Sequence, residues 1–264
     1  MFKLNVIILI VLTALGASIL GYFIVKDLRS DAKPLAEKVN ETPTLPPVAT
    51  TPLLDKEGRG AREVAKEEEK PKLPPAPDLN RAIMFKALVR EEDKPKIEAE
   101  IKIISQTLKD TPDYLQGWLQ LGILRKYIGD YEGASEAWEY AVKIRPKDFV
   151  AYNNLGDLYH FYLKNFPRSE SAIKKVIELR PDYTSAYRNL FELYALSYKE
   201  KEGLAAGALM DGISKNPKAY DLMVALAMYY KEKGNRDSAR KYLEDAIKLN
   251  PPNKSALEAE LSGL

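Results

Sequence analysis

The 264-residue chain contains no cysteine and only one histidine, His160. Without cysteine it has no disulfide, thiolate zinc site, iron–sulfur cluster or cysteine nucleophile. With one histidine it has no metal site built on several histidine ligands. The 40 Lys and Arg nearly equal the 38 Asp and Glu, so the formal net charge is only +2. Proteins that bind nucleic acid normally show a clear basic excess, so no nucleic-acid partner is expected.

Short motifs of common catalytic and cofactor sites are also missing. The sequence has no phosphate-binding glycine loop, no HExxH zinc motif and no calcium-loop pattern. His160 stands between Tyr159 and Phe161, without a nucleophile and an acid at catalytic spacing, so packing or the edge of a groove is its expected role. We therefore expect no enzymatic activity, no cofactor and no metal. An enzyme would need a polar pocket with perturbed titratable groups.

One long apolar run stands near the beginning of the sequence. After a three-residue tail, residues 4–25 contain no charge, and Lys3 and Lys26 flank them. As a helix this run would be about 33 Å long, enough to cross a hydrocarbon layer of about 30 Å. A cleaved signal peptide is the alternative, with a weak small-residue site near Gly16. Because the apolar run continues through Val25, a retained transmembrane signal anchor is favoured.

The orientation of this predicted anchor depends on its flanks. Counting basic residues alone would place the C-terminal side in the cytoplasm. The very short tail before Lys3 and the Pro- and Thr-rich stretch that follows favour the opposite orientation, with the N-terminus inside. The rest of the chain is therefore expected to be extracytoplasmic, with a cytoplasmic location as the alternative.

The next stretch has few apolar side chains. Residues 24–84 contain no aromatic side chain, and nine of the 17 prolines lie between Pro34 and Pro77. Proline disfavours helix and sheet because it fixes φ and lacks an amide donor. Without aromatic surface, little stabilisation offsets the entropy of ordering. Residues 26–77 are therefore predicted to form a disordered, Pro-rich and charged linker.

From residue 78 onward the sequence repeats. Apolar residues recur at helical spacing, and prolines recur at intervals of 34, 35, 36 and 34 residues, at Pro112, Pro146, Pro181, Pro217 and Pro251. A fixed period of this length is typical of a helical solenoid. Residues 78–264 are therefore predicted to form one repeat array with a continuous core.

The clearest unit, residues 115–148, resembles a tetratricopeptide repeat (TPR). Its matching residues are Trp118, Leu121, Gly122, Ala134, Trp138, Ala141 and Pro146. The resemblance implies an all-α, right-handed α-solenoid of about four to five helix pairs. The implied units are a degenerate pair at about 81–114, then 115–148, 149–183, 184–219 and 220–253, with a capping helix at 254–264.

Some positions depart from the family pattern. Arg125 stands where a tyrosine is expected, so one packing contact should change there. Gly212 fills a small-residue position and should mark a close approach of helices. The units at 149–183 and 184–219 carry one and two extra residues, which we place in the turns 162–168 and 198–203, because insertions in turns cost little.

The first helix of each repeat generally lines the binding groove in this family. The positions that carry over as a partner-binding groove are Lys126, Tyr127, Asn153, Asn154, Asp157, His160, Arg188, Asn189, Glu192 and Lys231. This polar set suits hydrogen-bonded recognition of a protein or peptide. Alternatively, side chains such as Asn153 and Asn154 satisfy only the neighbouring backbone. Leu119 replaces the lysine of carboxylate-gripping members, so that mode is not expected.

These features together predict a membrane-tethered scaffold that docks a partner polypeptide and raises its local concentration near the membrane. The alternative is a structural subunit of a cell-envelope assembly, such as a secretion, pilus or division complex. A scaffold should present an exposed groove, whereas a structural subunit should self-associate or expose a large apolar patch elsewhere.

Overall fold

A computed structural model of the chain describes residues 73–264. The described part is entirely helical apart from turns and irregular segments, and it contains no strand. No helix between residues 73 and 264 is both long enough and apolar enough to cross a membrane. The predicted transmembrane segment 4–25 and nearly all of the predicted linker 26–77 lie outside the described residues.

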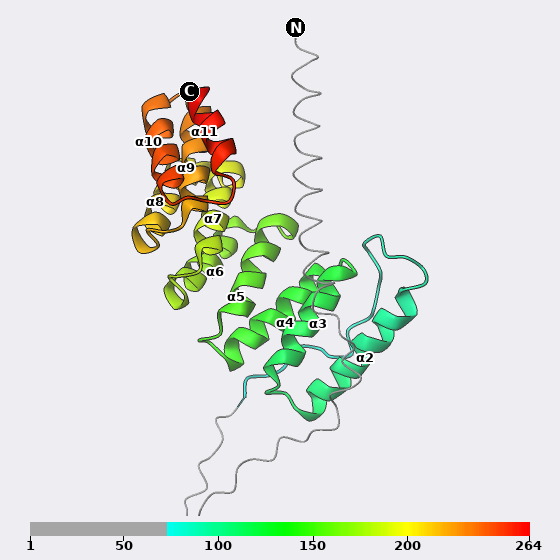
Figure 1. The fold of residues 1–264 in the computed structure, drawn as a ribbon. Helices are drawn as coiled ribbons and strands as arrows, with labels where there is room; N and C mark the ends of the chain where they lie inside the picture. The colour runs from blue at the N-terminus through cyan, green and yellow to red at the C-terminus, as the bar shows by residue number, and fades with distance from the viewer. Residues whose placement is uncertain (1–72) are drawn as a thin grey trace, which may run out of the picture. The chain divides into compact units, whose positions relative to one another are not determined.

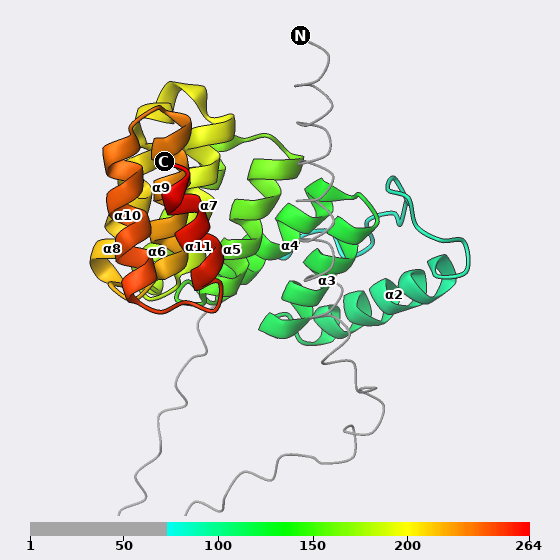
Figure 2. The same ribbon diagram turned by 45° about the horizontal axis from the view of Figure 1, so that its top comes forward.

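Four antiparallel helix pairs follow one another along the chain (Figure 1). They are α3 (Leu115–Tyr127) with α4 (Tyr131–Ile144), α5 (Phe149–Asp157) with α6 (Phe166–Leu179), α7 (Thr184–Glu192) with α8 (Ala205–Lys215), and α9 (Tyr220–Glu232) with α10 (Arg236–Lys248). The single helix α2 (Lys94–Asp110) precedes them, and α11 (Lys254–Ser262) follows. Each helix packs chiefly against its neighbours in sequence, and Figure 2 shows the same succession.

Local signals in the sequence set the helix ends. Side chains that accept a backbone amide of the first turn precede four helices; they are Asp130, Asp148, Asn165 and Asn235. Such caps satisfy amides that have no partner within the helix. Gly129 and Gly234 follow α3 and α9 with φ of 82° and 76°, a left-handed conformation that glycine adopts without steric cost.

The repeated aromatic and proline positions are joined by hydrogen bonds. The buried Trp118 indole donates to the carbonyl of Pro112 at 2.8 Å, and the Tyr187 hydroxyl donates to the carbonyl of Pro181 at 3.0 Å. Each aromatic therefore fastens its helix to the proline turn that ends the preceding unit. This contact explains why these aromatic and proline positions recur six residues apart.

Glycines allow the helices of a pair to approach closely. A Cβ at Gly122 would lie 2.2 Å from Nε1 of the buried Trp138, whose indole donates to the carbonyl of Leu119 at 3.1 Å. A Cβ at Gly212 would lie 2.7 Å from atoms of Tyr187 and Leu222. Gly212 thus marks a close approach of helices, as expected from its position in the repeat.

The first predicted helix pair is half wrong, because residues 73–93 form no helix. They run as an extended segment in which Leu79, Ile83, Phe85 and Val89 pack on the core. The even-numbered residues from Asn80 to Arg90 are exposed, Leu88 fully, whereas the odd-numbered residues between them are partly buried. Alternation with a period of two is the pattern of extended backbone, and prolines at the start of the segment disfavour a helix. The second predicted helix of this unit is present as α2.

The sequence predicts that the extra residues of the second and third pairs lie in the turns, but the structure also places some of them within helices. The first helix of each pair ends in a π-helical turn, η2 (Leu158–Tyr162) after α5 and η3 (Leu193–Ser197) after α7. A π turn holds one additional residue within a helix. In the third pair a short 3-10 segment, η4 (Lys199–Leu204), takes up the remainder. Thus part of each insertion widens a helix and reorients the side chains around it.

Candidate partner-binding face

The first helices of successive pairs are joined by ion pairs. Lys126 on α3 pairs with Asp157 on α5, and Arg188 on α7 pairs with Asp221 on α9. Lys231 on α9 pairs with Glu260 on α11. Ion pairs therefore join α3 to α5 and α7 to α9, and we call the side of these four helices that carries the paired residues the first-helix face.

The ten residues predicted for the groove come from these helices and from η2. Lys126 and Tyr127 lie on α3; Asn153, Asn154 and Asp157 on α5; His160 on η2; Arg188, Asn189 and Glu192 on α7; and Lys231 on α9. Four of the five Lys, Arg, Asp and Glu residues in this set are engaged in the ion pairs between helices; they are Lys126, Asp157, Arg188 and Lys231. Their charges are therefore partly neutralised before any partner arrives.

Four half-buried residues among the ten predicted for the groove have side chains without a hydrogen-bonded or ion-paired partner among residues 73–264. The side-chain amides of Asn153, Asn154 and Asn189 are half-buried and form no hydrogen bond with any residue of 73–264. Glu192 is also half-buried and makes no ion pair within that range. Burial raises the pKa of Glu192, and the nearby Arg188 opposes this shift. We call these four residues the open polar cluster.

His160 departs from the predicted groove because it is buried, with only 2% of its surface exposed. Its ring stacks on Phe161 at 3.9 Å between centroids, and Nε2 lies 2.8 Å from the Ser197 hydroxyl. Burial and the charge of Lys164 lower the pKa of His160, while Asp157 opposes the shift. His160 therefore joins the two π turns η2 and η3 and offers no surface to a partner. The expected packing role fits this position.

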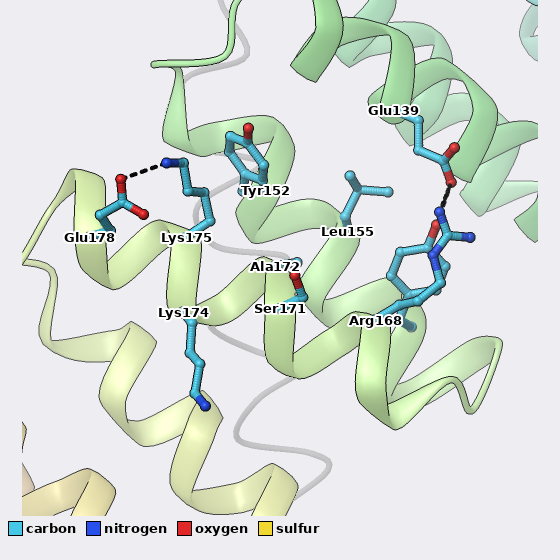
Figure 3. A pocket seen from close by; sticks show the side chains of 10 residues that line it. Glu139, Tyr152, Leu155, Arg168, Ser171, Ala172, Lys174, Lys175 and Glu178 are labelled. Atoms are coloured by element: carbon cyan, nitrogen blue, oxygen red, sulfur yellow. Dashed lines mark hydrogen bonds and ion pairs between the residues drawn. The ribbon is translucent and has the colours of Figure 1, made fainter.

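An open cleft of about 460 Å³ lies between α4, α5 and α6 (Figure 3). Leu155 and Ala172 line it, and the Arg168 guanidinium donates to Glu139 at 2.8 Å above the ring of Tyr159. The cleft holds no nucleophile beside a general base. None of the ten predicted groove residues lines it, so it is separate from the first-helix face.

The repeats match known family models. A TPR repeat model matches residues 124–160, and a tetratricopeptide repeat model matches residues 150–183 and 220–253. Residues 124–183 and 220–253 are thus similar in sequence to tetratricopeptide repeats. Between the matched ranges, the models leave out residues 184–219, the pair that contains η3 and η4.

The chain is similar in fold to a solved TPR structure. The C-terminal part of a TPR repeat-containing protein from Cytophaga hutchinsonii is 21% identical, with a TM-score of 0.51 over 63% of this chain and 68% of that chain. MamA is 24% identical, with a TM-score of 0.48 over 62% and 96% of the two chains. YrrB, described as a TPR protein with an unusual peptide-binding site, is 18% identical, with a TM-score of 0.47 over 64% and 86%. No curated protein matches the sequence.

One TPR position holds a charge cluster that the sequence analysis did not resolve. Arg125, in place of the family's tyrosine, is buried and donates to Asp130 at 3.1 Å and to the carbonyls of Ala82 and Arg81 at 2.7 and 2.8 Å. Arg81 also pairs with Asp130 at 2.8 Å. The substitution thus fixes the extended segment to the first TPR unit. The only sign of this charge cluster in the sequence is that Arg125 stands where the family has a tyrosine.

Glu170 forms a second buried cluster, on α6. Its carboxylate accepts from Lys174 at 2.6 Å, from the Tyr194 hydroxyl at 2.7 Å and from Lys201. Although burial opposes ionisation, these hydrogen bonds lower the pKa of Glu170 from 4.5 to about 2. Because the pKa is lower in the folded state, this stabilisation is complete above pH 4.5 and is lost as the pH falls toward 2.

We expect Glu170→Gln to lower the free energy of unfolding at pH 7 by about 1–3 kcal/mol, since hydrogen bonds to charged groups contribute on this scale. The variant should also show a shallower fall in stability between pH 4.5 and 2, measured by urea denaturation across that range. Glu178→Gln is the control, because Glu178 pairs with Lys175 at an exposed site. If the stability of Glu170→Gln fell between pH 4.5 and 2 as steeply as that of the original chain, this account would be contradicted.

Proposed function

We propose that the repeat array is a protein-interaction scaffold that binds a polypeptide segment on the first-helix face. The observation that carries the proposal is the open polar cluster of Asn153, Asn154, Asn189 and Glu192. Buried and half-buried polar groups in folded proteins normally have hydrogen-bond partners. Here the charged neighbours pair with one another, whereas these amides keep their donors and acceptors free.

The chemistry of the cluster suits a peptide backbone. An asparagine amide offers two donors and one acceptor, so it pairs with both the carbonyl and the N–H of a peptide group. Amides on α5 and on α7 belong to adjacent pairs, so a segment crossing both helices meets successive amides. Glu192 adds an acceptor whose raised pKa favours a partner group that supplies a positive charge or a strong donor.

A photoactivatable residue placed in the full-length chain tests this proposal. With the probe at Asn189, we expect irradiation in cells to give a covalent adduct with a polypeptide, because the segment would lie across this amide. A probe at Lys241, exposed on α10, is the matched control and should give no such adduct. Asn153→Ala with Asn154→Ala should reduce the adduct at position 189 without changing helicity. Equal adducts at both probe sites would refute the proposal.

The second candidate function is a structural subunit of a cell-envelope assembly. It is favoured by large apolar side chains that stay exposed away from the open polar cluster, including Leu204 and Met210 on the third pair. Exposed apolar surface of this kind commonly marks a protein contact. Permanent packing predicts that the chain co-purifies with a fixed stoichiometry of other subunits, whereas a scaffold exchanges its partner.

We also propose that residues 4–25 tether the scaffold to a membrane and that the repeats are extracytoplasmic. The support is the length and apolar character of the run and the short tail before Lys3. A tethered scaffold raises the local concentration of its partner at the membrane. A reporter fused after Leu264 tests the orientation, because it would be active only on one side of the membrane. Release of the chain by carbonate extraction would contradict the tether.

A further inference from the structure

Three successive first helices end with an exposed apolar side chain. Tyr127 in the last turn of α3 is 53% exposed, Phe161 in η2 is 48% exposed, and Leu196 in η3 is 69% exposed. The core of each pair is complete without them, since Trp118, Leu158 and Leu193 are fully buried beneath. We call Tyr127, Phe161 and Leu196 the apolar row.

The members of the apolar row share one side of the array. Each follows by four residues an equivalent repeat position, respectively Ile123, Asp157 and Glu192, of which the last two belong to the predicted groove. Residues four apart lie on the same side of a helix, so the row follows the edge of this face. In the fourth pair the corresponding position is the charged Glu232, which ends the row. Ile123, 47% exposed, and Tyr162, 40% exposed, widen it.

The charges around the row have both signs. At its first end Glu132 lies on the surface 3.9 Å from Lys86, and at its other end Lys199 and Glu200 are exposed. The whole chain carries a net charge of only +2. The apolar row is therefore not surrounded by charges of a single sign that would attract a strongly charged partner. A near-zero net charge leaves little electrostatic repulsion between two copies of the chain, so it permits self-association.

We infer that the apolar row is the contact between two copies of this chain related by a two-fold axis. In such a contact the same patch serves both copies, so a residue at the centre meets its own counterpart and the ends meet each other. Phe161 is the central member, so it faces Phe161 of the second copy, and Tyr127 faces Leu196. This arrangement also brings Glu132 of one copy toward Lys199 of the other.

The size of the patch sets the strength of the contact. Large aromatic and aliphatic side chains half-exposed at five positions give a patch of about 500 Å², comparable with the largest apolar patch on a typical monomer. Two such patches bury about 1,000 Å² in total, the lower limit for a specific interface. A reversible dimer is therefore expected, populated at high local concentration. It needs neither the open polar cluster nor its peptide, so it is independent of the proposed function.

The absence of cysteine allows a direct test with the full-length chain. Phe161→Cys alone should form a disulfide-linked dimer under mild oxidation, because the two-fold axis brings the two sulfur atoms together. Tyr127→Cys and Leu196→Cys should link poorly when each is alone but readily when the two variants are mixed. Leu204→Cys is the control and should not link. Leu204 is 52% exposed, close to the 48% of Phe161, and lies in the same pair as Leu196.

A charge at the centre of the row gives a second measurement. Phe161→Glu should weaken self-association by more than about tenfold in sedimentation equilibrium, because it buries two like charges opposite each other. Leu204→Glu should leave it unchanged, and helicity should be equal in both. Linking at Leu204 as fast as at Phe161, or no link at Phe161 at any protein concentration, overturns the proposed dimer.

Discussion

Trp138→Ala is expected to lower the free energy of unfolding by about 3–5 kcal/mol, the range for truncating a buried aromatic side chain. Trp138 is 1% exposed and fills the space that Gly122 leaves open, and its indole donates to the carbonyl of Leu119 at 3.1 Å. The variant therefore loses packing in both helices of the first pair and also leaves a buried carbonyl without its donor.

Chemical denaturation followed by circular dichroism measures this effect. Tyr127→Ala is the matched control, because Tyr127 is an aromatic residue on α3 of the same pair but is half-exposed; it should change stability by less than about 0.5 kcal/mol. Since each pair contacts only its neighbours, the loss should be largest in the first two pairs. A loss below about 1 kcal/mol for Trp138→Ala would show that the α3–α4 core is assigned wrongly.

Arg125→Ala is expected to lower the free energy of unfolding by about 2–4 kcal/mol, because the hydrogen bonds of a buried guanidinium are lost and Asp130 keeps only Arg81 as its charged partner. Asp130 is 3% exposed, and the two carbonyls of the extended segment would lose their guanidinium donor. Burial lowers the pKa of Arg125, and Asp130 opposes that shift, so the pair keeps the arginine charged at this buried site.

The loss of Arg125 should also release the extended segment. We expect amide hydrogen exchange at Lys86 and Ala87 to accelerate, because their amides bond only to the carbonyl of Ile128. Arg168→Ala is the control: Arg168 pairs with Glu139 at a half-exposed site, and its removal should cost less than about 1 kcal/mol. Equal costs for the two arginines would contradict the buried role of Arg125.

Much of the architecture is predictable because its signals are local and repeated. The prolines at intervals of 34 to 36 residues mark unit boundaries, and Trp118 and Tyr187 bond to the proline turns six residues before them. Capping residues such as Asp130 and Asn165 stand directly before the helices that they start. The apolar residues of 79–89 that pack on the core lie an even number of positions apart, which favours extended backbone, but they also fit helical spacing. The sequence alone therefore predicts a helix where the structure has an extended segment.

The candidate site was harder to predict because it depends on contacts between units. Sequence places Lys126 and Asp157 in the groove, but their ion pair forms only once adjacent first helices are stacked. The resemblance to the TPR family places His160 in the groove, because the family pattern assumes a regular first helix. A π turn adds a residue at that point, and the sequence does not say whether a helix or a turn absorbs it. Only the stacked structure separates the engaged charges from the free amides.

The extended segment has a mechanical consequence. Its successive attachments, at Pro74 to Tyr140, at Arg81 to Asp130 and at Lys86 to Ile128, lie in series along one line of backbone. Tension applied along that line through the preceding chain acts on all three attachments at once, whereas tension at right angles breaks them one after another. A force on the preceding residues would therefore reach the first TPR pair through the three attachments of the extended segment, and not through the end of a helix. Its resistance to unfolding should therefore depend on the direction of the pull.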